Sequence, residues 1–411
     1  MNKYRDKKVV IFGLGTYEKG AGISAALFLA RKGAKLLITD SKTKKQLSHQ
    51  IKKLEKYTLD KSGKKNIEYV LGKHRNQDFV NIDFVFKNPS VPKHSEYLEI
   101  ARKNNIPVIN DWTIYFEEKP GNILIGITGT KGKSVTTALI HHIIKTAGKD
   151  VVLCGNIGQS PIAILKKIKK NTIVVAELSS WSLQQFDRSP HIAVLTNLMP
   201  DHLDKYKNLR EYYDDKRRIY KFQKPGDHFI KEKQGIEAAT EVAKFLKIPQ
   251  KTINQAIKTF KGVTGRLEFV REKNGIIYIN DTCATMPHAT VHALHQLKKT
   301  CPEQSRRIIL IAGGVDKKLN YKKLAQEIPK YCKALILLKG TASEKIIKNL
   351  EIQNPLKIKT DVSSMKSAIK TAMKFANKSD VVLLSPGAAS FNIFKNEFDR
   401  GDQFVKEVKK I

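Results

Sequence analysis

The sequence has few cysteines and no cysteine pair of the C-x-x-C type. The four cysteines, Cys154, Cys283, Cys301 and Cys332, lie far apart along the 411 residues. This spacing argues against a disulfide framework and against a zinc site, both of which use closely spaced cysteines. We therefore expect reduced thiols and a cytoplasmic protein.

Long apolar segments are also missing. No uninterrupted apolar stretch approaches the roughly 18 residues that a membrane-spanning helix needs. The first apolar run, residues 9–12, is short and leads into glycines and the charged pair Glu18 and Lys19. We therefore expect neither a membrane span nor a signal peptide.

Acidic residues are scarce, since 39 Asp and Glu face 75 Lys and Arg, which gives a formal net charge of +36. Such an excess can attract nucleic acid, acidic lipid or a polyanionic substrate. The lysines, however, are dispersed in short pairs such as Lys52-Lys53 and Lys298-Lys299 rather than gathered in one tract. Dispersed lysine is typical of a solvated surface, so we expect no nucleic-acid or membrane partner.

Strand-like apolar segments alternate with segments of helical periodicity along the chain, which predicts an α/β protein with largely parallel sheets. The clearest strand candidates are residues 9–12, 36–40, 123–125, 276–279, 308–311, 335–338 and 381–384. A length of 411 residues predicts two or three domains. Turn-rich junctions near residues 119–121 and 262–265 place the expected domains at 1–118, 119–264 and 265–411.

A glycine-rich loop at residues 126–134, with the sequence GITGTKGKS, lies between a predicted strand and a predicted helix. Backbone N–H groups and a helix N-terminus in that context can hold phosphate oxygens. Lys133 would neutralise the outer phosphates, and the Ser134 hydroxyl would hold magnesium. The strict phosphate-loop spacing fails by one residue, because Gly126 lies six positions before Gly132. The loop still predicts a nucleotide site.

The same loop belongs to a series of motifs that resembles the Mur ligases along nearly the whole chain. The motifs are TGTKGKS at 128–134, GNIG at 155–158, ELSS at 177–180, DHLD at 201–204, ND at 280–281 and GGVDK at 313–317. The closing stretch, residues 389–401, is most similar to the family members that add D-glutamate. The resemblance implies a Rossmann-like UDP-binding domain, a shortened phosphate-loop ATPase-type central domain and a Rossmann-like C-terminal domain.

The resemblance also implies an activity, namely ATP-dependent amide-bond formation through an acyl phosphate in peptidoglycan precursor synthesis. The expected substrates are UDP-N-acetylmuramoyl-L-alanine and D-glutamate, and the expected cofactors are ATP and Mg²⁺, in a cytoplasmic monomer. Catalysis of this kind rests on positioning and charge neutralisation. Two alternatives stay open: a family ligase with another amino acid or another UDP-linked donor, and an inactive nucleotide-binding relative.

By the same resemblance Lys133, Glu177, His202 and Lys216 are the catalytic residues. Ser134, Glu177 and His202 would hold magnesium ions, and Lys216 would carry a carbamate that organises the second ion. An ordinary lysine has a pKa of about 10.4, so burial or neighbouring cations would have to lower the pKa of Lys216. This metal-binding set favours an enzyme over a mere binding module.

The other expected contacts fall into three groups. ATP would be held by Thr128, Gly129, Thr130, Lys131, Gly132, Lys133, Ser134, Arg266, Asn280 and Asp281. The UDP-linked substrate would be held by Gly15, Thr16, Asp40, Ser41, Asn88 and Asn156. The incoming amino acid would be held by Thr285, Lys317, Ser390 and Asn396.

Some positions depart from the family pattern. Cys283 stands where the family has a lysine, and Glu397-Phe398 reverses the usual order of aromatic and acidic residue. Only 49 residues separate Lys216 from Arg266, fewer than the family's central domain provides. The family's H-N-x-x-N motif reads KEKQG at residues 231–235. We therefore expect weak discrimination between ATP and other purine triphosphates.

Overall fold

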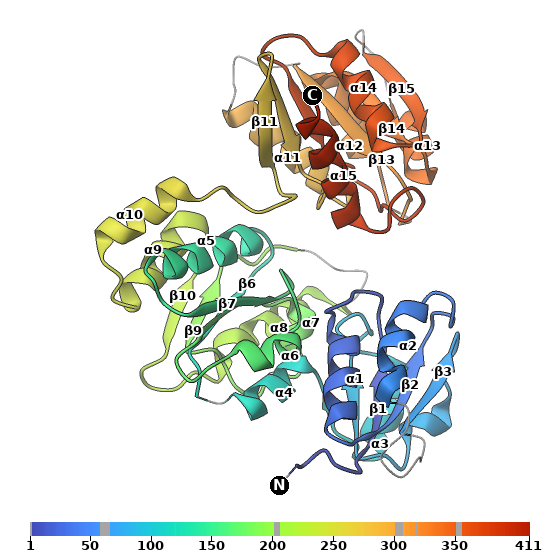
Figure 1. The fold of residues 1–411 in the computed structure, drawn as a ribbon, viewed down its shortest axis with the longest axis vertical. Coiled ribbons are helices and arrows are strands. Elements are labelled where there is room, and N and C mark those ends of the chain that lie inside the picture. The colour runs from blue at the N-terminus through green and yellow to red at the C-terminus, as the bar shows by residue number, and fades with distance from the viewer. Residues whose placement is uncertain are drawn as a thin grey trace. The chain divides into compact units, whose positions relative to one another are not determined.

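The computed structural model describes residues 2–57, 66–119, 121–200, 206–300, 307–317, 319–350 and 356–411 (Figure 1). The chain packs as two compact units, Met1–Phe260 and Lys261–Ile411. The first unit contains two sheets and the second contains one.

The N-terminal sheet of the first unit has five parallel strands in the order β3-β2-β1-β4-β5. Its strands are β1 (Lys8–Phe12), β2 (Lys35–Asp40), β3 (Ile67–Leu71), β4 (Phe84–Lys87) and β5 (Val108–Ile109). The helices around it are α1 (Ala21–Arg31), α2 (Ser48–Leu54), α3 (Glu96–Lys103) and α4 (Asp111–Glu118), with short 3₁₀ turns at Glu55–Tyr57 and Asn76–Phe79.

The central sheet has five parallel strands in the order β10-β9-β6-β8-β7. They are β6 (Leu124–Thr128), β7 (Val151–Gly155), β8 (Ile173–Glu177), β9 (Ile192–Leu195) and β10 (His228–Lys231). The helices are α5 (Lys133–Thr146), α6 (Pro161–Ile164), α7 (Ser180–Leu183), α8 (Leu209–Lys221), α9 (Gly235–Phe245) and α10 (Gln250–Thr259), and a 3₁₀ turn spans Leu165–Lys167. Strands β6 and β8 are buried at every position, as expected of parallel strands covered on both faces.

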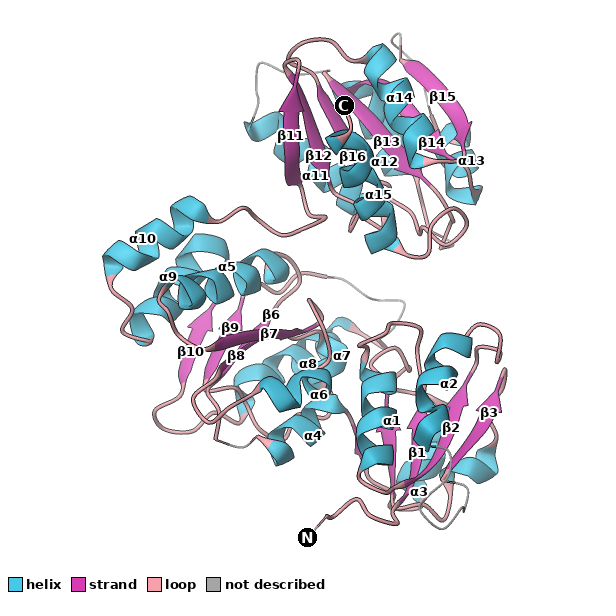
Figure 2. Cartoon of the chain, in the orientation of Figure 1, coloured by secondary structure: helices cyan, strands magenta, loops and turns pink. Residues whose placement is uncertain are grey.

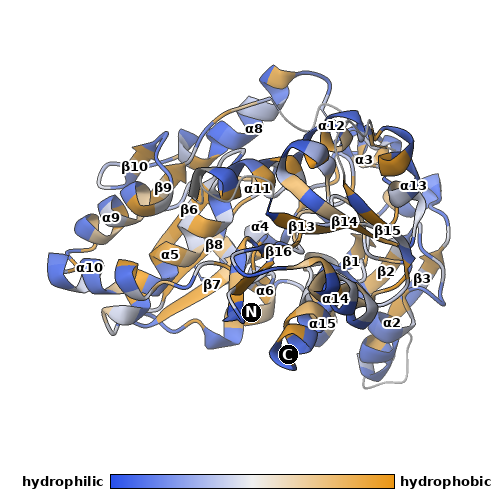
Figure 3. Ribbon diagram, turned by 90° about the horizontal axis from the view of Figure 1, so that it is seen from above, coloured by the Kyte–Doolittle hydropathy of each residue, from blue (hydrophilic) through white to orange (hydrophobic). Residues whose placement is uncertain are grey.

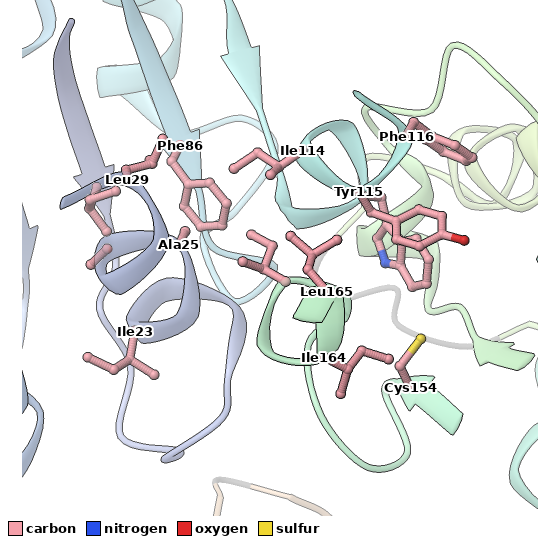
Figure 4. Packing of buried hydrophobic residues seen from close by; sticks show 14 of the residues in the cluster. Ile23, Ala25, Leu29, Phe86, Ile114, Tyr115, Phe116, Cys154, Ile164 and Leu165 are labelled. Atoms are coloured by element: carbon pink, nitrogen blue, oxygen red, sulfur yellow. The ribbon is translucent and has the colours of Figure 1, made fainter. Parts of the chain in front are cut away.

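One hydrophobic cluster joins the two sheets of the first unit. It combines side chains of α1, such as Ile23 and Leu29, with Ile114 of α4 and Ile164 of α6, all at most 1% exposed. Figure 4 shows the side chains of α1 facing those of α4 and α6. Apolar burial of this extent is the main favourable term in packing, so the N-terminal and central sheets form a single compact unit.

The second unit is a six-stranded sheet in the order β11-β12-β16-β13-β14-β15, in which only the β11–β12 pair is antiparallel. Its strands are β11 (Glu268–Lys273), β12 (Ile276–Asn280), β13 (Ile308–Gly313), β14 (Cys332–Leu338), β15 (Lys357–Val362) and β16 (Val381–Leu384). Its helices are α11 (Pro287–Thr300), α12 (Lys322–Tyr331), α13 (Thr341–Lys348), α14 (Met365–Phe375) and α15 (Glu397–Lys409) (Figure 2).

The predicted α/β class with largely parallel sheets is therefore confirmed. Figure 3 shows the hydrophobic character gathered in central strands such as β6 and β8, while the helices show mixed faces. None of the helices in the described ranges is long and apolar enough to cross a membrane. The cysteines within those ranges, Cys154, Cys283 and Cys332, are free thiols.

We expect Ile164→Ala to lower the free energy of unfolding of the first unit by about 2–5 kcal/mol, because it leaves a cavity in the apolar cluster that α6 shares with α1 and α4. Urea unfolding followed by tryptophan fluorescence reports on this unit, since Trp112 and Trp181 both lie in it. The control is Ile236→Ala, whose side chain is 56% exposed on α9. Equal losses in the two variants would contradict the packing role of Ile164.

Candidate functional site

The glycine-rich loop connects the end of β6 to the start of α5, at the carboxyl edge of the central sheet. Ligands of open α/β sheets bind at this edge. Gly129 and Gly132 have φ angles of +143° and +80°, which side chains rarely adopt. A Cβ on Gly129 would also collide with the Thr196 hydroxyl. The loop conformation therefore requires glycine at both positions.

Asn197, just after β9, fixes the first half of the loop. Its backbone carbonyl accepts from the Thr130 N–H at 3.0 Å. Its side-chain Oδ1 accepts from the Lys131 N–H at 2.9 Å, and its Nδ2 donates to the Lys131 carbonyl at 3.0 Å. With these amides engaged, the N–H groups at the start of α5 are the ones that a phosphate can use, because the first turn of a helix lacks internal acceptors.

Two of the predicted catalytic lysines reach this loop. Lys133 Nζ donates to the Thr130 carbonyl at 2.9 Å. Lys216 Nζ, carried by α8, donates to the Gly129 carbonyl at 2.7 Å and lies over the Tyr212 ring. Lys216 is only 2% exposed. The structure thus brings two cations, 83 positions apart in the sequence, to one loop.

Glu177 ends β8, where it pairs in register with Ile127 of β6, so its carboxylate lies at the same sheet edge. The side chain is 1% exposed. One oxygen, Oε1, accepts from Asn156 Nδ2 at 3.0 Å, whereas Oε2 has no hydrogen-bond partner among the residues described. A buried carboxylate oxygen without a donor fits a divalent cation, because Mg²⁺ takes oxygen ligands.

Of the other residues predicted to bind magnesium, the structure describes only some. His202 lies outside the described residues. Ser134 is buried in the first turn of α5. Within the described residues, no three His, Cys, Asp or Glu side chains cluster as a ready-made metal site. A magnesium ion here would therefore depend on substrate phosphates and water as well as on Ser134 and Glu177.

The expected donor-binding turn follows β1. Asp40, at the end of β2, accepts from the Leu14 and Gly15 N–H groups at 2.9 and 3.1 Å and from the Lys42 N–H at 2.9 Å. Asp40 thus holds the turn itself, an intramolecular role that the sequence did not reveal. Asn88 Nδ2 donates to the Gly13 carbonyl at 3.0 Å.

Other donor-side residues differ in exposure and in position. Thr16 accepts through its carbonyl from Gln50 Nε2 at 2.6 Å, whereas Ser41 is exposed. Asn156 lies by Glu177 rather than by the β1 turn. The structure therefore gathers Gly15, Asp40 and Asn88 and leaves Asn156 at the central sheet.

The segment after β4 also carries charges that contact α8. Lys93 Nζ lies 2.8 Å from Asp215 Oδ1 and 3.2 Å from Glu211 Oε1. Lys87 is 1% exposed, and burial lowers its pKa to about 8, although the nearby Asp215 and Asp111 carboxylates oppose this shift. These contacts join the segment that carries Asn88 to the helix that carries Lys216.

In the second unit the expected nucleotide contacts lie in a network of their own. Asp281 accepts from the Leu267 N–H at 3.2 Å and from the Ser385 hydroxyl at 2.8 Å. Burial raises the pKa of Asp281 to about 6. Asn280 Nδ2 donates to Glu268 Oε2 at 2.9 Å. Both side chains therefore already stabilise the end of β12.

The four residues expected to hold the amino acid differ in burial, hydrogen bonding and electrostatic surroundings. Ser390 is 2% exposed, and its hydroxyl has no hydrogen-bond partner among the described residues. Burial lowers the pKa of Lys317, whereas the neighbouring Glu397 carboxylate raises it. Asn396 caps α15 by accepting from the Asp399 N–H at 2.9 Å. Thr285 is half-buried.

Arg400 lies in the closing stretch of residues 389–401, but the sequence analysis assigned it no role. Its guanidinium is completely buried and donates to Thr282 Oγ1, the Thr282 carbonyl and the Ala388 carbonyl. Burial lowers the pKa of Arg400 to about 10. This arginine ties α15 to the strand end next to Cys283, so the two departures at Cys283 and Glu397 lie in one region.

The fold defines an α/β protein with a glycine-rich loop between a parallel strand and the following helix. Three family models match the chain: the N-terminal domain of MurD-like Mur ligases at residues 7–110, the Mur ligase middle domain at 127–277, and the glutamate ligase domain of Mur ligases at 265–387. A UDP-N-acetylmuramoylalanine–D-glutamate ligase from Roseiflexus sp. (strain RS-1) is 33% identical, with 98% of each chain covered. The chain belongs to the Mur ligase family.

A second relative supports the same family. The enzyme of the same name from Borreliella burgdorferi (strain ZS7) is 31% identical over 100% of this chain and 99% of its own length. The fold is similar to those of MurC from Thermotoga maritima, with a TM-score of 0.56 at 17% identity, and MurF from the same organism in complex with ADP, with 0.55 at 16%. The MurC comparison covers 98% of this chain and 99% of the MurC chain, and the MurF comparison covers 100% of both chains.

We expect the pKa of Lys87 to give the first unit a specific pH dependence. The unfolded lysine keeps its proton up to about pH 10.5, but the folded one loses it near pH 8, so the unfolded state binds more protons in this window. The free energy of unfolding of the wild type, relative to Lys87→Met, should therefore rise between pH 8 and 10.5, by on the order of 3 kcal/mol across the whole window.

Urea unfolding of both proteins at several pH values measures this difference, and other titrating groups cancel in the comparison. A constant difference from pH 7.5 to pH 10 would mean that Lys87 keeps an ordinary pKa in the folded state.

Proposed function

We propose that this protein is an ATP-dependent ligase that joins D-glutamate to UDP-N-acetylmuramoyl-L-alanine in peptidoglycan precursor synthesis. The observation that carries the proposal is that the phosphate loop, Lys133, Lys216 and the Glu177 carboxylate meet at one sheet edge, with Glu177 Oε2 left without a hydrogen-bond partner among the described residues. The relatives that cover the full chain, and that have this activity in their names, support the choice of substrates.

The reaction has two steps. The donor carboxylate attacks the γ-phosphorus of ATP, the bond to the ADP oxygen breaks, and an acyl phosphate forms. The amine of D-glutamate then attacks the acyl carbon, a C–N bond forms, inorganic phosphate leaves with the C–O electron pair, and the amine gives up a proton. Both steps place negative charge on oxygens, so fixed cations and N–H donors are the groups that accelerate them.

The phosphate loop supplies these donors and cations. The N–H groups at the start of α5 would hold the β- and γ-phosphates, and Lys133 would leave the Thr130 carbonyl to bind the transferred phosphoryl group. Mg²⁺ would be held by Ser134 and Glu177, with His202 expected at a second ion. When bound, magnesium neutralises phosphate charge and orients the transferred group.

Lys216 is proposed to react with carbon dioxide and to become a carbamate. Its burial and its position beside the Gly129 carbonyl, at the sheet edge where the nucleotide is proposed to bind, support this role. The modification replaces a cation with an anion, which can organise the second magnesium ion.

The other proposed substrate contacts come from residues of both units. Gly15, Thr16, Asp40, Ser41, Asn88 and Asn156 are proposed for the UDP-linked donor, Arg266, Asn280 and Asp281 for the nucleotide, and Thr285, Lys317, Ser390 and Asn396 for D-glutamate. The unpartnered hydroxyl of Ser390 supports this acceptor region. We further propose a cytoplasmic monomer that acts without nucleic acid or membrane.

A second candidate is a ligase of the same family with another amino acid. It is favoured by one observation, namely that Glu397 and the uncharged Cys283 lie in the region of Lys317 and Arg400. A carboxylate in this region, together with a cysteine where the family has a lysine, weakens the attraction for a dicarboxylate.

We expect purified protein supplied with ATP, Mg²⁺ and UDP-N-acetylmuramoyl-L-alanine to release phosphate with D-glutamate, because Lys317 and Ser390 suit an acidic acceptor. The assay compares D-glutamate with L-glutamate and with neutral and basic amino acids. Lys133→Ala is the matched inactive control, since it removes the cation of the phosphate loop. Turnover with a neutral or basic amino acid and none with glutamate would favour the second candidate.

We expect Lys216→Ala to be nearly inactive and to regain part of its activity with a small added carboxylate such as acetate, which can replace the carbamate anion. Lys221→Ala, an exposed position on the same helix, is the control and should behave as the wild type. Turnover near the wild-type rate in Lys216→Ala without acetate would refute the carbamate.

A further inference from the structure

The short turn between β10 and α9 lies on the phosphate loop. Strand β10 ends at Lys231 and α9 begins at Gly235, so three residues make the connection. The Gly235 N–H donates to Thr136 Oγ1 at 2.8 Å, and Thr136 Oγ1 donates to the Gly132 carbonyl at 2.8 Å. The start of α9 is therefore tied to the first turn of α5.

Gln234, the last residue of this turn, packs against the loop. A Cβ added to Gly132 would collide with Gln234 Oε1, so the two residues are in close contact. Gln234 Oε1 also accepts from Asn197 Nδ2 at 3.1 Å. The side chain is exposed, and it reaches the loop at the point where α5 begins.

The hydrogen-bond network determines which end of the Gln234 amide faces the loop. The Lys131 N–H can only donate, so the Asn197 atom that it contacts is the oxygen, and the other atom is the NH₂ group. This NH₂ group donates to Gln234, and the Gln234 atom that receives it is therefore the carbonyl oxygen. The Gln234 NH₂ group, Nε2, is left with its two protons and has no bond within the described part of the chain.

We propose that Gln234 is a nucleotide-binding residue whose Nε2 donates to an oxygen of the triphosphate chain. The proposal rests on the nucleotide use proposed above, and it adds a contact that the shortened central domain supplies. The group of Gln234 that has no partner in the described ranges is the NH₂ donor, and the acceptors that a nucleotide brings to the start of a phosphate-loop helix are phosphate oxygens.

This assignment separates phosphate binding from base recognition. An amide can read adenine with a donor and an acceptor together, but the carbonyl oxygen of Gln234 accepts from Asn197 and is packed against Gly132, so it faces the loop rather than a base. A contact through Nε2 alone is the same for ATP and GTP, since both carry the same triphosphate. Gln234 thus strengthens nucleotide binding without restoring discrimination between purines.

The test is isothermal titration calorimetry of the full-length protein with ATP and with GTP, each with Mg²⁺ and without donor or acceptor. We expect Gln234→Ala to raise the Kd of ATP and of GTP by a similar factor, about tenfold. Gln234→Glu keeps the shape but replaces the donor with an anion, so it should weaken both nucleotides further. Gln255→Ala, at an exposed glutamine of α10, is the control and should leave both Kd values unchanged.

Two results would overturn the proposal. One is an unchanged Kd, within twofold, for both nucleotides in both Gln234 variants. The other is a loss confined to ATP, which would make Gln234 a reader of the base. Because binding is measured without the ligase reaction, a protein that binds ATP but forms no amide bond would refute the proposed function and leave the Gln234 contact intact.

Discussion

The hydrogen bond from the buried Lys216 ammonium to the Gly129 carbonyl is the contact on which the central site depends. It requires a backbone carbonyl that faces α8, and this is possible because Gly129 adopts a φ of +143°. The same conformation leaves no space for a side chain against Thr196. One glycine thus connects the phosphate loop, the neighbouring strand end and the helix that carries the proposed carbamate.

Charge–charge contacts extend this arrangement to the N-terminal sheet. The segment that follows β4 includes Asn88 and also Lys93, whose ammonium contacts Asp215, the residue before Lys216. Charges in such partly dry surroundings interact more strongly than at the surface. The segment after β4 and helix α8 therefore share an ionic contact, and both belong to the first compact unit.

In the second unit, most of the expected ligand-binding residues named here already have partners within the protein. The residues expected to contact the nucleotide, Asn280 and Asp281, already form hydrogen bonds within this unit. Their partners are Glu268, Leu267 and Ser385. Both side chains therefore stabilise the strand end, in addition to any contact with a ligand. Only Ser390, among the expected acceptor residues, presents a buried polar atom without a partner in the described ranges. The buried Arg400 supports this region by bonding to three oxygens on two segments.

The sequence by itself determined the α/β class and the place of the glycine-rich loop between a strand and a helix, because strand–helix alternation and short motifs such as TGTKGKS are local patterns; the site residues that it proposes remain predictions. It did not reveal that Asp40 holds its own turn, that Lys87 is buried beside Asp111 and Asp215, or that Gln234 lies on Gly132. Each of these contacts joins residues from different parts of the chain. Only the tertiary structure decides them, since burial and hydrogen-bond partners depend on which strand ends and helix termini meet in space.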